Sequence, residues 1–192
     1  MNMPEPKPDT PYRILVVDDN QAIHEDFRKT LGEDRSGKDF DEEHADFFGT
    51  APPVSGKARY ELDFALQGEE ALDLLTAARD AGRRYSVVFM DVRMPPGIDG
   101  VETTARILEI DPDVQVVICT AFCDYTFAEI IKRLGGTDRL TILRKPFNVT
   151  EVVERTLDLT GEWMMQQEAR RKAGTVLRPP TAIHRAREGE ER

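Results

Sequence analysis

Long apolar runs are missing from this sequence. No stretch approaches the roughly 20 consecutive apolar residues that a membrane-spanning helix needs, and charged residues make up 32% of the chain. The first ten residues are rich in proline and lack the basic-then-apolar order of a secretory signal peptide. We therefore expect residues 1–10 to be a flexible lead-in, and the protein to be cytoplasmic and to make no membrane contact.

Cysteine and histidine are also scarce. Cys119 and Cys123 are the two cysteines, and a disulfide between them is not expected in a reducing compartment. Two thiols alone are too few for a metal site, so both are expected to be ordinary buried or half-buried residues. His24, His44 and His184 are scattered singly. The sequence therefore gives no support for a zinc site.

The charge is strongly negative and unevenly distributed. The formal net charge is −10, although residues 162–192 hold seven basic and five acidic side chains. The acidic excess therefore lies in the preceding part of the chain, which repels a phosphate backbone, and direct nucleic-acid binding is not expected. Clustered acidic side chains can instead hold Mg²⁺.

Five apolar segments rich in β-branched residues predict strands. Three of them, ILVV, SVVFM and VQVVIC, are apolar almost without alternation, which is typical of strands covered on both faces. The predicted strands are Tyr12–Val17, Tyr60–Leu66, Tyr85–Met90, Val114–Cys119 and Leu140–Leu143.

Helical spacing of apolar residues separates these strands. A fifth helix is predicted to begin at Asn148, with Glu151 as its capping-box partner. Because strand and helix alternate, the expected fold is a parallel sheet with right-handed crossovers and helices on both faces. The first four apolar stripes are Ile23, Phe27 and Leu31; Ala71, Leu74, Leu75 and Ala78; Val101, Ala105 and Leu108; Phe127, Ile130, Ile131 and Leu134.

Two regions exceed this minimal pattern. Residues 32–58 are far longer than the roughly 2–6 residues usual for such a connection. They are too short to have a core of their own, so a mobile or partly helical insertion is favoured over a second domain. The predicted domain spans 11–160 with a loop insertion at 32–58, and residues 161–192 form a helix extension and a disordered tail.

Polar residues follow four of the predicted strands, at the edge where α/β sheets carry their functional sites. They are Asp18, Asp19, Asp91, Thr120 and Lys145. Two unit charges ~4 Å apart repel by about 4 kcal/mol at an effective dielectric of 20, and a divalent cation with oxygen ligands relieves such repulsion. Mg²⁺ is the expected ion. Taken singly, each aspartate is better explained as a helix cap or a strand end, and it is their occurrence together at successive strand ends that favours a functional site.

Four motifs in this order resemble the response-regulator receiver family of two-component signalling, from Tyr12 to about Thr160. This resemblance implies a flavodoxin-like (βα)5 fold, a doubly wound five-stranded parallel sheet with the strand order 2-1-3-4-5. The motifs are ILVVDDN (14–20), VVFMDVRMPPGIDG (87–100), VVICTA (116–121) and KPF (145–147).

The same resemblance implies a role for each site residue. Asp91 matches the phosphoacceptor, and Asp91 and Asp19 match the side-chain ligands of Mg²⁺. Asp18 acts through water, and the main-chain carbonyl of Arg93 completes the protein ligands. Thr120 matches the switch hydroxyl and Lys145 the basic partner of the phosphoryl oxygens.

The implied function is transfer of a phosphoryl group from a histidine kinase or phosphotransfer protein to Asp91, with output through protein–protein contacts. Such a domain is no enzyme beyond phosphotransfer to itself and slow self-dephosphorylation. The segment Trp163–Lys172 either begins a signalling helix or a homodimer contact, or simply ends the last helix on its own domain. These two interpretations stay open.

The sequence departs from the family pattern in three places. Ile142 occupies the position of a frequent aromatic residue, Gly135–Thr141 is longer than the usual turn, and MPPGIDG has one residue more than the common pattern. The bond between Lys145 and Pro146 is expected to be cis.

Three alternatives compete with a free-standing phosphorylated receiver. A phosphatase of the haloacid dehalogenase type needs a second acid two positions after its nucleophile, where Asn20 stands after Asp18. A receiver-like scaffold that is never phosphorylated would be expected to lack a key site residue, and none is missing. The third alternative is the N-terminal receiver of a longer sensor kinase or cyclase.

Overall fold

Five parallel strands form one sheet in the order β2-β1-β3-β4-β5, as predicted. The computed structural model describes residues 11–32, 59–121, 127–135 and 138–176. Register pairs such as Val17 with Met90 in β1 and β3, and Asp91 with Cys119 in β3 and β4, align the carboxyl ends of the strands. The strands are β1 (Tyr12–Val17), β2 (Tyr60–Ala65), β3 (Val87–Asp91), β4 (Gln115–Thr120) and β5 (Leu140–Arg144).

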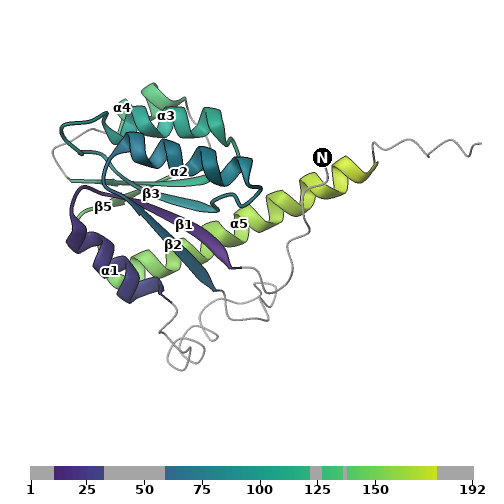
Figure 1. Ribbon diagram of the computed structural model, residues 1–192, viewed down its shortest axis with the longest axis horizontal. Coiled ribbons are helices and arrows are strands. Elements are labelled where there is room, and N and C mark those ends of the chain that lie inside the picture. The colour runs from purple at the N-terminus through teal and green to yellow at the C-terminus, as the bar shows by residue number, and fades with distance from the viewer. Residues whose placement is uncertain (1–10, 33–58, 122–126, 136–137, 177–192) are drawn as a thin grey trace, which may run out of the picture.

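Five helices cover the two faces of this sheet. Helices α2, α3 and α4 lie on one face, and α1 and α5 lie on the other (Figure 1). The doubly wound α/β arrangement is therefore confirmed. The helices are α1 (Gln21–Leu31), α2 (Gly68–Asp80), α3 (Gly100–Ile110), α4 (Phe127–Leu134) and α5 (Val149–Val176).

Alternate residues of the central strands belong to two separate hydrophobic cores, one on each face of the sheet. Leu15 and Val88 pack in the core under α2, α3 and α4, whereas Val16 and Phe89 pack in the core under α1 and α5. Both sets are almost completely buried. This two-sided burial explains why these strands are apolar without alternation.

Helix α5 begins where the sequence predicts. The backbone N–H of Glu151 donates to Asn148 Oδ1 at 2.9 Å, and the backbone N–H of Asn148 donates to Glu151 Oε2 at 2.9 Å. This is the predicted capping box. The helix then continues for 28 residues to Val176, a length of about 42 Å at 1.5 Å per residue, and it extends past the sheet (Figure 1).

Several predictions fall outside the described residues. They are the lead-in at 1–10, most of the insertion at 32–58, the tail beyond 176, Cys123, His44 and His184. Cys119 is a buried free thiol, as expected. Among the described helices, none combines the length and the apolar content that crossing a bilayer requires.

Candidate functional site

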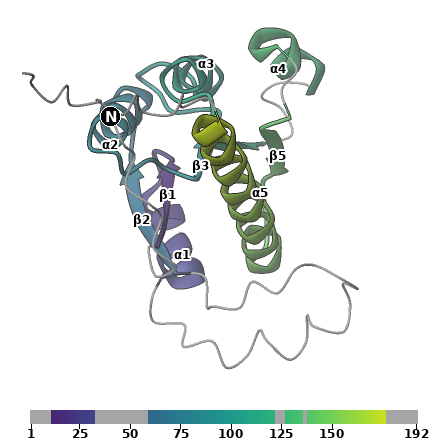
Figure 2. The same cartoon turned by 90° about the vertical axis from the view of Figure 1, so that its right-hand side faces the viewer.

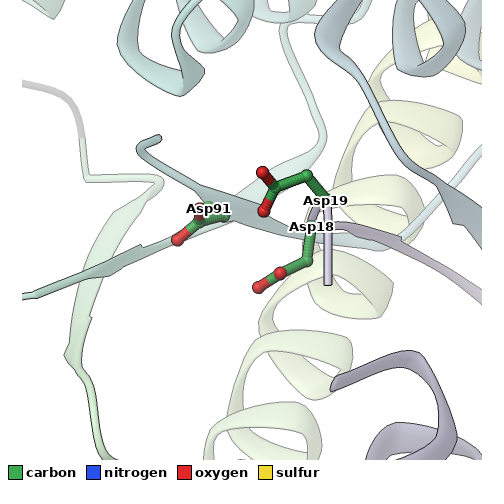
Figure 3. A group of neighbouring side chains, drawn as sticks. All are labelled: Asp18, Asp19 and Asp91. Atoms are coloured by element: carbon green, nitrogen blue, oxygen red, sulfur yellow. The ribbon is translucent and has the colours of Figure 1, made fainter. Parts of the chain in front are cut away.

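Three carboxylates meet at the carboxyl edge of the sheet. Asp18 and Asp19 directly follow β1, and Asp91 is the last residue of β3. One oxygen atom from each lies within 4.8 Å of the others, and Figure 3 shows the three side chains gathered at this edge. The strand register therefore brings together residues that are far apart in the sequence.

This group fits a hard divalent cation. Asp18 and Asp91 are buried, whereas Asp19 is exposed and leaves one side open to water. Mg²⁺ prefers a few carboxylate oxygens together with water and phosphate oxygens, so the donor set suits this ion. The members of this group, which lies among the described residues, are three aspartates, without a histidine or a cysteine.

The lysine after β5 reaches into the same cluster. Lys145 Nζ donates to Asp18 Oδ2 at 2.6 Å and to Asp91 Oδ1 at 2.7 Å. Burial alone would lower the pKa of Lys145, but the hydrogen bonds to the two carboxylates outweigh it and the pKa is raised. Burial raises the pKa of Asp91 above its ordinary value, although Lys145 opposes this shift.

The backbone places Lys145 beside the end of β4. Its backbone N–H donates to the carbonyl of Thr120 at 2.9 Å, and the bond from Lys145 to Pro146 is cis, as expected. The buried hydroxyl of Thr120 donates to the carbonyl of Ala121 at 3.1 Å. A groove of about 440 Å³ begins at Thr120 and is lined in part by Ile142 on β5 and Arg155 on α5.

Arg93 lies beside Asp91 through its main chain. Its backbone N–H donates to Asp91 Oδ2 at 3.2 Å, while its side chain is exposed. The loop after Arg93 then returns to the end of β3, where the N–H of Gly100 donates to the carbonyl of Val92 at 2.9 Å. A Cβ atom on Gly100 would lie 1.9 Å from the main-chain oxygen of Asp91, so only glycine fits here.

Gln67 is a site-edge residue that the sequence interpretation missed. Its side-chain Nε2 donates to the carbonyl of Pro95 at 3.3 Å, and its Oε1 accepts from the N–H of Gly97 at 3.3 Å. Gln67 thus holds the outer part of the longer MPPGIDG loop, in which the bond from Pro95 to Pro96 is cis. Nothing in the local sequence marks Gln67, because its partners lie about 30 residues away.

Comparison with known proteins gives a consistent result. The sequence model of the response regulator receiver domain family matches residues 42–157 of this chain. The matched segment contains Asp91, Thr120 and Lys145, and it begins after Asp18 and Asp19. Sporulation initiation phosphotransferase F of Bacillus subtilis (strain 168) is 33% identical over 99 residues, which is 52% of this chain and 73% of that protein.

A second type of relative is longer than this chain. Response regulator MprA of Mycobacterium sp. (strain KMS) is 30% identical over 147 residues, which is 76% of this chain and 49% of that protein. The chain therefore spans about half the length of the MprA relatives that it matches.

Solved structures share the fold at low sequence identity. A CheY-like response regulator receiver domain protein from Methanospirillum hungatei JF-1 has a TM-score of 0.59 at 16% identity, with 82% of this chain and 99% of that chain covered. An adenylate cyclase from Rhodopirellula baltica has a TM-score of 0.63 at 19% identity, with 86% and 98% covered.

Proposed function

Because the chain belongs to the response regulator receiver domain family, we propose that Asp91 accepts a phosphoryl group in a Mg²⁺-dependent reaction. The donor is a histidine kinase or a phosphotransfer protein. The observation that carries this proposal is the position of Asp91, whose carboxylate is bonded to Lys145 and lies among two further carboxylates at the sheet edge.

The chemistry requires little beyond positioning and charge neutralisation. A carboxylate oxygen of Asp91 attacks phosphorus, the bond from phosphorus to the donor atom breaks, and the bonding electrons leave with the donor. The product is an acyl phosphate. Lys145 neutralises the charge of the phosphoryl oxygens, because its ammonium group already forms a salt bridge with the Asp91 carboxylate.

The metal has a defined place in this proposal. Asp19 and Asp91 would hold Mg²⁺ with the main-chain carbonyl of Arg93, and Asp18 would act through a water molecule. The ion supplies charge neutralisation for the transferring phosphoryl group. Lys145 now balances part of the charge of Asp18 and Asp91, so we expect it to release Asp18 when the ion binds.

The signal arises from the additional negative charge on Asp91. Thr120 is at the end of the neighbouring strand and is the hydroxyl that can turn toward the new phosphoryl oxygens. Such a movement rearranges the chain after β4, and it passes the signal on through protein contacts. We propose no catalytic activity beyond this transfer and slow hydrolysis of the acyl phosphate.

The test is intact mass spectrometry after incubation with Mg²⁺ and acetyl phosphate. Wild type and Asp73→Asn, which removes an exposed acid on α2, are expected to gain one phosphoryl group, and Asp91→Asn is expected to gain none. Binding of beryllofluoride is read in the same session, because a short-lived adduct escapes mass detection. Absence of both signals in wild type would favour the unphosphorylated scaffold.

The oligomeric state is a separate part of the proposal. Leu157, Met164 and Met165 are large apolar residues exposed on α5, and they support a homodimer contact along this helix. Sedimentation with and without beryllofluoride tests it. A monomer in both states at high protein concentration would contradict the homodimer.

A further inference from the structure

A buried carboxylate lies at the amino-terminal edge of the sheet, opposite the Asp91 site. Asp113 precedes β4 and is 0% exposed. Its Oδ2 lies 2.5 Å from Arg170 Nη1 and 3.3 Å from Arg84 Nη1, and its Oδ1 lies 3.4 Å from Arg139 Nη1. Three arginines from three separate segments therefore converge on one carboxylate.

A second carboxylate completes this group, which we call the Asp113 cluster (Arg84, Asp111, Asp113, Arg139 and Arg170). Asp111 Oδ1 accepts from the backbone N–H of Asp113 at 3.1 Å and lies 3.5 Å from Arg84 Nη1. A buried charge is tolerated only when it is paired, so the arginines cannot leave Asp113 together.

Arg170 differs from the other two arginines. Its side chain is 56% exposed, whereas those of Arg84 and Arg139 are each 26% exposed. Arg170 also comes from α5, while the other two come from connections at the sheet edge. It is therefore the member that can separate from the cluster while the domain stays folded.

Further contacts hold the same part of α5. The Gln115 side-chain Nε2 donates to Gln166 Oε1 at 3.4 Å. On the other side, the Tyr12 hydroxyl donates to Met164 Sδ at 3.2 Å, and the rings of Tyr12 and Trp163 meet edge to face at 6.5 Å. This part of α5 thus contacts both β1 and β4. The end of the helix extends past the sheet (Figure 1), and Figure 2 views the molecule from the side on which α5 ends.

The opposite end of α5 follows the Asp91 site closely in the sequence. The helix begins at Val149, after the short segment that follows Lys145, and the capping box of Asn148 and Glu151 fixes its first turn. Between Val149 and Val176 the helix is uninterrupted. Residues 146–148 connect Lys145, whose ammonium contacts Asp91, to the first turn of α5, and the helix then runs without a break to Arg170, which contacts Asp113.

We propose that the Asp113 cluster is an anchor that makes α5 a rigid link between the Asp91 site and the chain beyond residue 170. A displacement of Lys145 shifts the first turn of α5, and the helix transmits this shift to Arg170. There the anchor sets the direction in which the helix leaves the domain. This inference rests on the proposed function, since phosphorylation supplies the displacement. Asp113 and Arg170 are positioning residues that touch no reacting atom.

The anchor is tested with Trp163, which is the single tryptophan of the chain. Arg170→Gln is compared with Lys172→Gln, which removes a cation whose partner, Glu168, is on the same helix at 2.8 Å. We expect acrylamide quenching of Trp163 and hydrogen exchange at 164–173 to rise about twofold or more in Arg170→Gln because local opening becomes easier. The control is expected to match wild type. Equal quenching and exchange in both variants would overturn the anchor.

The link is tested by adding beryllofluoride and Mg²⁺ to the same proteins. Fluorine NMR reports binding at Asp91, and hydrogen exchange reports residues 163–173. We expect bound beryllofluoride to alter exchange there in wild type and in Lys172→Gln, and this effect to be lost in Arg170→Gln, which still binds the ligand. Binding without any change at 163–173 in wild type would overturn the link alone. Failure to bind would overturn the proposed function and, with it, the link.

Discussion

Lys145 Nζ lies 2.7 Å from Asp91 Oδ1, although the two residues are 54 positions apart in the sequence. The same ammonium contacts Asp18 at 2.6 Å. One lysine thus compensates two buried carboxylates at the edge of the sheet, and we expect it to compete with a cation that binds there.

Replacing this lysine should strengthen Mg²⁺ binding and weaken phosphorylation. In Lys145→Met the carboxylates lose their counter-charge, so we expect Mg²⁺ to bind about tenfold more tightly, which corresponds to about 1.4 kcal/mol. Phosphorylation by acetyl phosphate should slow by at least about tenfold, since one neutralising charge is gone. Calorimetric titration with Mg²⁺ and timed mass spectrometry measure the two effects.

The control for this experiment is Lys132→Met, which removes an exposed lysine on α4. It should leave the Mg²⁺ affinity and the rate unchanged. If Lys145→Met bound Mg²⁺ more weakly than wild type, Lys145 would be supporting the cation site instead of competing with it.

The sheet and its functional edge were predictable because their signals are local. Continuous apolar runs marked the strands, and β1 was predicted with the bounds that the structure has. Since the carboxyl ends of parallel strands lie at one edge of a sheet, the positions of Asp18, Asp91 and Lys145 after their strands predict that these side chains meet. The capping pattern at Asn148 and Glu151 likewise gave the start of α5.

The Asp113 cluster and the two hydrogen bonds of Gln67 to the loop at Pro95 and Gly97, which we call the Gln67 clamp, could not be predicted in this way. No pattern of apolar spacing relates the connection that contains Asp113 to the helix that contains Arg170, and a charged residue in a turn usually remains in solvent. The interior position of Asp113 follows from where α5 and two connections cross the amino-terminal edge. That crossing is a property of the assembled fold, and no sequence window contains it.

Gln67→Leu is expected to loosen the loop beside Asp91. The change removes the hydrogen bonds to Pro95 and Gly97, both 3.3 Å long, and a net hydrogen bond contributes about 0.5–1.5 kcal/mol. We expect faster hydrogen exchange at Gly97 and a lower free energy of unfolding by about 1 kcal/mol. Gln67→Glu keeps the acceptor for Gly97 and should show wild-type exchange there. Unchanged exchange in Gln67→Leu would contradict the clamp.

Gly161→Ala is expected to stabilise the protein. Gly161 lies inside α5, and a Cβ atom there would meet nothing within 4 Å. Alanine should raise the free energy of unfolding by about 0.5–1 kcal/mol in urea titrations, because it restricts the unfolded chain and favours the helix. Gly100→Ala is the contrasting variant and should lower it by about 1–3 kcal/mol through overpacking against Asp91. A destabilising Gly161→Ala would mean that this face of α5 is covered in solution.

Asp111 should give the stability a pH dependence of identifiable sign. Its carboxylate is buried, and burial raises its pKa above the ordinary value in spite of the N–H of Asp113 and the charge of Arg84. The folded state therefore retains a proton that the unfolded state has lost, so the contribution of Asp111 to stability falls as pH rises from the ordinary pKa through the raised one, and then stays constant.

Asp111→Asn keeps a hydrogen-bond acceptor and removes this titration. Unfolding measured from about pH 4 to pH 7 should show the variant gaining stability relative to wild type as pH rises, because the ordinary pKa of aspartate is about 3.9. The exposed Asp138→Asn is the control for the loss of one carboxylate. A trend in the opposite direction for Asp111→Asn would show that its arginine contact outweighs burial.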